Sequence, residues 1–253
     1  MVARPQIRIV ANREALAQAG AEEFAHCAEQ AIAEHGSFAV ALSGGSTPKD
    51  LYARLASEQH PFRRQIAWDK IHFFWGDERH VPPDDAQSNY RMTNEAMLSK
   101  LPVPAENVYR VPAEMADAAQ AAAAYQQTLR KYFRLGEGEL PRFDLVLLGL
   151  GPEGHTASLF PDNTVPREGG QLVAAPWVEK FNTFRITLTP AVLNHAVQVA
   201  FLASGEEKAQ IVADVIEGPV QPDLLPAQLI RPERVPVLWL LDAGAAGKLK
   251  DAS

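Results

Sequence analysis

The segment GPEGHTASLFP, residues 151–161, carries the strongest sign of chemistry in the sequence. Glycine and proline occupy four of the six positions 149–154, a composition that forces a specific loop ending on His155. Glu153 lies two residues before the histidine, and two hydroxyl residues follow within three positions. Because an unperturbed imidazole titrates near pH ~6.5, His155 is a candidate base at neutral pH. A purely structural histidine is the alternative.

A second candidate is the turn SGGSTP, residues 43–48, which directly follows the apolar run FAVAL. Its two glycines let the backbone approach a ligand closely, and the helix expected after it would offer free N–H groups to an anion. An ordinary strand–helix turn whose hydroxyl residues cap the helix fits the same pattern. The residues of this turn that we expect to bind substrate are Ser43, Gly44, Gly45, Ser46 and Thr47.

A third candidate is the charged segment after the apolar run IHFFW. Asp77 and Arg79 arrive where that run stops, so they should emerge at the rim of a sheet, and Asn89 opens the helix expected next. A solvated charged loop is the alternative interpretation. We expect Asp77 to have a catalytic role and Arg79 and Asn89 to bind substrate.

Three cations complete the candidate site. Lys180 and Arg185 lie in the segment EKFNTFRITLT, and Lys208 lies in SGEEKAQ at the start of an expected helix. A lysine in the first turn is unfavourable with the helix dipole, and a bound phosphate would justify that placement. We therefore expect Lys208 to bind substrate, with a solvated lysine as the alternative. Lys180 and Arg185 are further candidates for substrate binding because of their positive charge.

The composition excludes several classes of protein. The 253 residues carry a formal net charge of −7, which argues against a protein that coats nucleic acid or an anionic membrane. The single cysteine, Cys27, permits neither an intrachain disulfide nor a cysteine metal site. No second histidine stands at ligand spacing from His155, which disfavours a metal hydrolase. With no apolar stretch long enough for a signal peptide or a membrane span, we expect a cytoplasmic protein without a cofactor.

Strand-like and helix-like segments alternate along the chain, which predicts an α/β fold with a mostly parallel sheet covered by helices. We expect the chain, residues 1–253, to form one domain, because no segment resembles a linker. The expected helices span 13–35, a stretch beginning near 46, 89–101, 117–135 and 206–216. The expected strands span 38–42, 71–75, 108–111, 143–149, 185–188, 197–203 and 237–241.

Taken together, the segments ALSGGSTPKDLY, FFWGDERHVPPDDAQSNYRM, DLVLLGLGPEGHTASLFP, RITLTPAVLNHA and SGEEKA resemble those of the 6-phosphogluconolactonase family in order and spacing. The resemblance covers about residues 38–210. It implies a Rossmann-like fold with helices on both faces of the sheet, like that of glucosamine-6-phosphate deaminases. It also implies hydrolysis of 6-phospho-D-glucono-1,5-lactone to 6-phospho-D-gluconate, a step of the oxidative pentose phosphate pathway that needs no cofactor.

The resemblance also assigns roles to individual residues. His155 matches the family's general base, which activates water to attack the lactone carbonyl. The family usually has aspartate two residues before this histidine, where this chain has Glu153. Deaminases of the same superfamily have a glutamate five residues after the histidine, where this chain has Phe160, so the resemblance favours the lactonase over the deaminase. A sugar-phosphate sensor that had lost catalysis would lack the base or a cation, and this chain has both.

Overall fold

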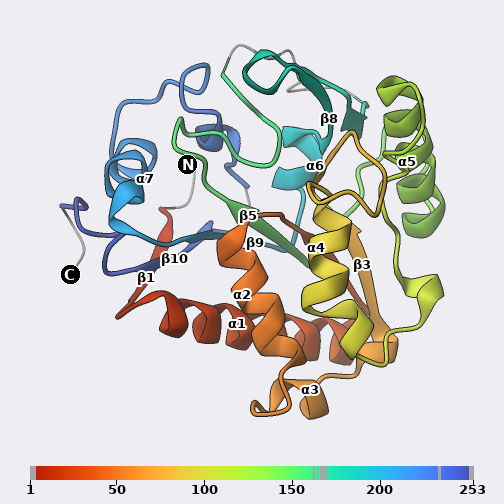
Figure 1. The fold of residues 1–253 in the computed structure, drawn as a ribbon, viewed down its shortest axis with the longest axis horizontal. Helices are drawn as coiled ribbons and strands as arrows, with labels where there is room; N and C mark the ends of the chain where they lie inside the picture. The colour runs from red at the N-terminus through yellow and green to blue at the C-terminus, as the bar shows by residue number, and fades with distance from the viewer. Residues whose placement is uncertain (1–3, 162, 164, 166–169, 233–234, 251–253) are drawn as a thin grey trace.

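A six-stranded parallel sheet runs through the middle of the molecule (Figure 1). The computed structural model describes residues 4–161, 163, 165, 170–232 and 235–250. The strand order is β1-β10-β9-β5-β2-β3. These strands are β1 (Gln6–Val10), β2 (Phe38–Leu42), β3 (Ile71–Trp75), β5 (Leu145–Gly149), β9 (Gln198–Ala203) and β10 (Leu238–Asp242).

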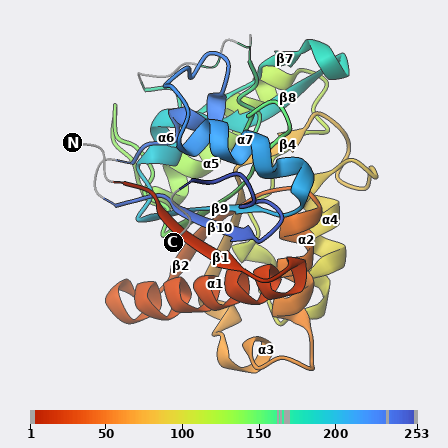
Figure 2. The same cartoon turned by 90° about the vertical axis from the view of Figure 1, so that its left-hand side faces the viewer.

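The central strands are apolar because helices cover both faces of the sheet. Every residue of β2 and of β10 is buried. Figure 2 shows α1 (Arg13–His35) and α2 (Ser46–Ala56) on one side of the sheet, and α5 (Ala118–Phe133), α6 (Pro190–Asn194) and α7 (Ala209–Ile216) on the other. Right-handed crossovers produce this division, since the chain first winds towards β3 and then reverses towards β10. The Rossmann-like α/β fold expected from the sequence is confirmed.

A smaller antiparallel sheet begins where β3 ends. Its strands are β4 (Asp77–Arg79), β6 (Val173–Ala174), β7 (Trp177–Val178) and β8 (Thr183–Leu188). In it β8 pairs with each of the other three, and α5 packs against β6 and β8. Because β4 follows β3 after a single glycine, this sheet stands beside the carboxyl edge of the parallel sheet.

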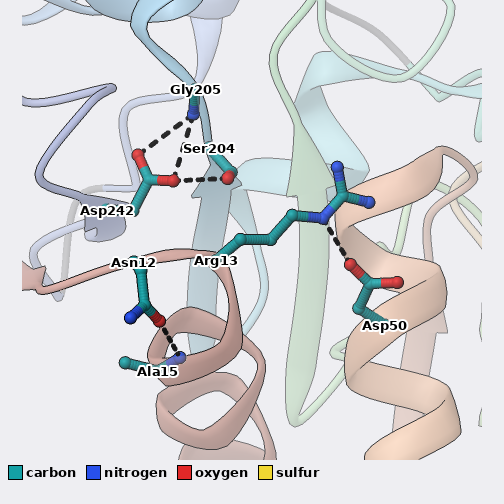
Figure 3. A network of polar contacts seen from close by, with 7 residues as sticks. All are labelled: Asn12, Arg13, Ala15, Asp50, Ser204, Gly205 and Asp242. Carbon is teal, nitrogen blue, oxygen red and sulfur yellow. Dashed lines mark hydrogen bonds and ion pairs between the residues drawn. The ribbon is translucent and has the colours of Figure 1, made fainter.

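The first helix shows how local sequence sets its boundaries. Asn12 precedes α1, and its side-chain oxygen accepts a hydrogen bond from the Ala15 N–H at 2.9 Å (Figure 3). Gly36 follows the helix with φ 88°, a left-handed conformation that glycine adopts without strain. Between these ends, side chains such as Leu16 and Phe24 are buried in the core.

The remaining helical segments are short. They are α3 (Phe62–Gln65), α4 (Asn89–Ala96) and six 3₁₀ turns: η1 (Trp68–Lys70), η2 (Leu98–Lys100), η3 (Ala105–Asn107), η4 (Glu179–Phe181), η5 (Glu206–Lys208) and η6 (Pro226–Leu229). Within the described residues, no helix combines the length and the apolar character needed to span a membrane.

Several expected elements need correction. Residues 108–111 form no strand, because Val108 makes only an isolated bridge with Phe73 and Pro112 has no N–H to extend the pairing. The strand expected at 185–188 exists, but it belongs to the antiparallel sheet as part of β8. Residues 77–79 form β4 rather than a loop. The expected hydroxyl cap of α2 is also wrong, because Gly45 occupies the cap position and no side chain bonds there.

Candidate active site

One pocket lies where the carboxyl ends of four strands meet. Loops after β2, β3, β5 and β9 line it, and it sits at the point between β2 and β5 where the chain reverses its direction along the sheet. Open α/β sheets bind ligands at this type of position. Ten of the thirteen residues expected at the site line the pocket: Ser43, Gly44, Gly45, Ser46, Thr47, Asp77, Arg79, Asn89, His155 and Lys208. The other three, Glu153, Lys180 and Arg185, are not among its lining residues.

The imidazole of His155 is fixed from two sides. Its ring stacks on Phe160 with centroids 4.1 Å apart, and on the other side the ring lies against Gly151. A Cβ on Gly151 would come within 1.9 Å of Nδ1, so only glycine leaves room for the ring. The loop also contains Gly154 with φ 77° and Ala157 with φ 47°. The left-handed conformation at position 154 explains why the sequence has glycine there.

Glu153 links His155 to Lys180. The Lys180 ammonium donates to Oε1 of Glu153 at 2.7 Å, while Oε2 of Glu153 lies 3.1 Å from Nδ1 of His155. The second contact has ion-pair distance, but its alignment is not that of a hydrogen bond, and neither atom has another partner within the described residues. Lys180 was expected to bind substrate. In the structure its ammonium serves the Glu153 carboxylate, and its side chain is 56% exposed.

The charges around His155 and Glu153 set their protonation. Burial lowers the pKa of His155 below its ordinary value, and the nearby carboxylates of Glu153 and Asp77 oppose this only in part. Burial raises the pKa of Glu153, but the bond from Lys180 and the proximity of His155 outweigh it and bring the value to about 2. At neutral pH the histidine is therefore a neutral base beside an ionised carboxylate. Nε2 makes no hydrogen bond within the described part of the chain, so it is free to act in the pocket that the ring lines.

Asp77 is held by the loop that carries His155. The Ser158 hydroxyl donates to Oδ2 of Asp77 at 2.7 Å, and both side chains are buried. The Asn89 amide donates to the Asp77 carbonyl at 2.9 Å and lies so close to Gly44 that a Cβ there would be 2.0 Å from its oxygen. Asn89 thus joins the ends of β2 and β3. Sequence reasoning missed the role of Ser158, whose only sign is its place in the histidine segment.

Glu78 faces away from the pocket and organises the start of α4. Its buried carboxylate accepts from the backbone N–H groups of Arg79, Asn89 and Tyr90 at 2.7–2.8 Å and from the Ser88 hydroxyl at 3.2 Å. Burial raises the pKa of Glu78, and the three backbone hydrogen bonds work in the opposite direction. A carboxylate at this position also interacts favourably with the dipole of α4, because it lies at the N-terminus of that helix. Glu78 therefore supports two neighbouring candidates for substrate binding, Arg79 and Asn89.

The glycine turn after β2 offers hydrogen-bond donors to the pocket. The Tyr52 hydroxyl accepts from the Ser43 N–H at 3.0 Å and donates to the Ser43 carbonyl at 2.9 Å, which fixes the start of the turn. Gly45 has φ 104° and occupies the N-cap position, directly before Ser46, the first residue of α2. Within the described residues the N–H groups of Ser46 and Thr47 have no acceptor, as the first turn of a helix leaves them. These N–H groups can donate hydrogen bonds to a bound anion.

Three cations lie in or beside the pocket, and they differ in their burial and their contacts. Lys208 lines the pocket, burial lowers the pKa of its ammonium, and the ammonium has no partner among the described residues. Arg79 lines the pocket and faces Arg185 across the β4–β8 pair. Arg185 is only 7% exposed, its Nε has no partner in the part of the chain that the structure describes, and burial together with Arg79 lowers the pKa of its guanidinium. Two facing arginines in this state favour a bound anion.

No group of three or more histidine, cysteine, aspartate or glutamate side chains among the described residues could hold a metal ion. The polar groups of the pocket are hydrogen-bond donors, the cations Arg79 and Lys208, the carboxylate of Asp77 and one neutral imidazole. This combination suits base chemistry on an anionic small molecule.

The sheet and its pocket define an α/β protein of Rossmann-like fold with a cationic, polar pocket at the carboxyl ends of its strands. Residues 11–239 match the family of glucosamine-6-phosphate isomerases and 6-phosphogluconolactonases. The chain belongs to this family.

Individual relatives agree with this assignment. A 6-phosphogluconolactonase of Synechocystis sp. is 37% identical over 246 residues, which cover 97% of this chain and 99% of the relative. One of Nostoc sp. is 41% identical over 221 residues, 87% of this chain and 88% of the relative. The solved 6-phosphogluconolactonase of Trypanosoma brucei is 32% identical with a TM-score of 0.86 over 97% of this chain and 99% of that one. A monomeric glucosamine-6-phosphate deaminase, 18% identical with a TM-score of 0.81 over 96% and 99%, shares the fold.

Proposed function

We propose that this chain hydrolyses 6-phospho-D-glucono-1,5-lactone to 6-phospho-D-gluconate in the oxidative pentose phosphate pathway, with His155 as general base. Its relatives named for this activity support the proposal. The observation that carries it is the placement of His155. A partly buried, neutral imidazole lines a pocket that also holds the cations Arg79 and Lys208 and the free N–H groups of a helix.

In the proposed reaction, Nε2 of His155 accepts a proton from water while the water oxygen attacks the lactone carbonyl carbon. We assign the proton of the neutral ring to Nδ1, the nitrogen that faces the Glu153 carboxylate at 3.1 Å, which leaves Nε2 free to accept a proton. The carbonyl electrons move to oxygen and then return, which breaks the bond to the ring oxygen. His155 gives its proton to that departing oxygen, and the new carboxylic acid ionises. Glu153 would stabilise the imidazolium, and a positioned base of this kind contributes about 10²–10⁴-fold.

The proposed reaction needs anion-binding groups in two places, at the phosphate of the substrate and at the carbonyl oxygen where negative charge develops. Arg79, Lys208, Ser46 and Thr47 all line the pocket that His155 lines. We propose that they hold the phosphate and stabilise the oxyanion that forms on the carbonyl oxygen. We assign Lys180 to the Glu153 carboxylate, which its ammonium bonds, rather than to the substrate. The cytoplasmic location expected from the sequence stays a prediction.

The experiment that tests the function compares three substrates. Freshly generated 6-phosphogluconolactone, unphosphorylated gluconolactone and glucosamine 6-phosphate are given to the purified protein, and acid or ammonia release is measured above the spontaneous rate. We expect rapid hydrolysis of the phosphorylated lactone, much slower hydrolysis of the unphosphorylated one because the cations lack a phosphate, and no ammonia. Deamination, or lactone hydrolysis at only the spontaneous rate, would contradict the proposal.

A further inference from the structure

A buried carboxylate outside the pocket organises the turn that carries Lys208. Asp242 ends β10 and is only 6% exposed. Figure 3 shows its carboxylate accepting from the Ser204 hydroxyl at 2.5 Å and from the Gly205 N–H at 3.0 and 3.1 Å. The Ala245 N–H adds a further bond at 2.8 Å. Asp242 is not among the residues that line the pocket, so it does not face the substrate.

The turn of residues 204–208 is held by its own hydrogen bond and by packing against the residues that follow β10. Gly205 has φ 102°, and its carbonyl accepts from the Lys208 N–H at 3.0 Å, which closes the 3₁₀ turn η5. Gly244, two residues after Asp242, packs against the same turn, because a Cβ there would lie 3.0 Å from the Glu206 backbone nitrogen. The end of β10 therefore holds η5 by hydrogen bonds and by close packing.

The position of Lys208 is unfavourable for a cation and requires a rigid turn. It sits immediately before α7, where the helix dipole disfavours a cation, and it is partly buried without a partner within the described residues. A flexible lysine in this situation would turn towards solvent. A rigid turn instead keeps its ammonium in the pocket that it lines.

We propose that Asp242 is a positioning residue that sets the place of the Lys208 ammonium in the substrate pocket by fixing the turn of residues 204–208. The identity of the substrate in this inference rests on the proposed function. Asp242 acts through Lys208 and makes no contact with substrate.

The negative charge of Asp242 helps to fix the turn of residues 204–208. Burial raises the pKa of this carboxyl, but the bonds from Ser204, Ala245 and Gly205 and the charge of Arg13 together lower it. Both carboxylate oxygens of Asp242 accept hydrogen bonds. An asparagine would replace one oxygen by an NH₂ group, which would face a donor and could not accept its hydrogen bond. Asp242→Asn therefore loosens the turn with almost no change in side-chain volume.

A double-mutant cycle tests the inference. We would measure kcat and KM for the phosphorylated lactone in the wild type, Asp242→Asn, Lys208→Ala and the double variant. Asp242→Asn should lower kcat/KM about tenfold through KM, as expected for a displaced binding group. In the Lys208→Ala background the same change should have an effect below about twofold, because the positioned group is gone. An equal effect in both backgrounds, or none in either, would overturn the proposal.

Matched variants separate this role from a loss of stability. Asp50→Asn makes the same chemical change nearby, where Asp50 pairs with Arg13 on the surface, and should leave kcat and KM unchanged. If Asp242→Asn does not fold, Gly244→Ala presses on the Glu206 nitrogen of the same turn from outside the pocket and should show the same coupling at about threefold. A wild type without lactonase activity would contradict the proposed function instead. In that case the cycle is measured on the affinity for inorganic phosphate, and equal effects in both backgrounds would again overturn the role of Asp242.

Discussion

At the scale of the residue, His155 combines burial with one negative neighbour on its Nδ1 side. Burial disfavours the imidazolium and the Glu153 contact favours it. The net lowering of the pKa keeps the ring neutral at the start of the reaction, while Glu153 is in place when the ring takes a proton. Phe160 supplies a flat apolar surface on which the ring stacks.

The first prediction concerns the pH dependence of lactone hydrolysis. Because burial holds the pKa of His155 below 6.5, kcat should stay constant through neutral pH and fall only as the pH drops through that lowered value. The charged groups that act on the ring are Glu153 on its own loop, Asp77 from β4 and Lys180 from η4. The measurement is kcat against pH after subtraction of spontaneous hydrolysis.

Two variants should move that midpoint in opposite directions. Glu153→Gln removes a negative charge that raises the pKa of His155, so the midpoint should shift to lower pH. Lys180→Met removes a positive charge that lowers the same pKa, so the midpoint should shift to higher pH. If Lys180→Met instead raised KM strongly and left the midpoint in place, Lys180 would be a substrate ligand, as the sequence first suggested.

At the scale of the element, the junction between β4 and α4 depends on Glu78. Glu78→Ala leaves three backbone N–H groups and one hydroxyl without their acceptor. Since each buried donor left without a partner costs about 1–3 kcal/mol, we expect the free energy of unfolding to fall by about 3 kcal/mol or more. Urea unfolding measures it.

The control for this prediction lies on the same helix. Glu95 is exposed and pairs with Arg91 one turn away, so Glu95→Ala should leave the unfolding midpoint near that of the wild type. Equal midpoints for Glu78→Ala and Glu95→Ala would show that the capping contacts of Glu78 add nothing to stability.

Some elements could be predicted from sequence and others could not, for physical reasons. The helix 13–35 and the strands 38–42 and 71–75 have the predicted bounds, because caps or continuous burial on both faces leave a clear local pattern. β1 was missed because it is an edge strand, with a mixture of charged and apolar residues and no fully buried position. β4 was missed because its three residues are charged and its pairing partner, β8, lies about a hundred residues later.

At the scale of the whole molecule, the pocket exists because strands distant in sequence end side by side. The alternating pattern predicted that the chemistry would gather at the carboxyl ends of a parallel sheet, and the structure confirms this for the loops after β2, β3, β5 and β9. The pairings across the site could not be predicted. Glu153 with Lys180, Ser158 with Asp77 and Asp242 with Ser204 each join separate elements and leave no local signal.

The overall charge gives no sign of the local charge of the site. The chain has a formal net charge of −7, yet Arg79, Arg185 and Lys208 gather in or beside one pocket. None of the three forms a salt bridge within the described part of the chain. A few cations in a partly buried site outweigh a diffuse surface charge, because water screens the surface charge more strongly.

The most direct test of the central claim is the turnover of His155→Ala with 6-phosphogluconolactone. We predict that kcat falls by about 10²–10⁴-fold towards the spontaneous rate, because the positioned base is lost. The unfolding midpoint should stay close to that of the wild type, since the side chain is 22% exposed and lines the pocket. Wild-type turnover in a folded His155→Ala protein would contradict the assignment of the base.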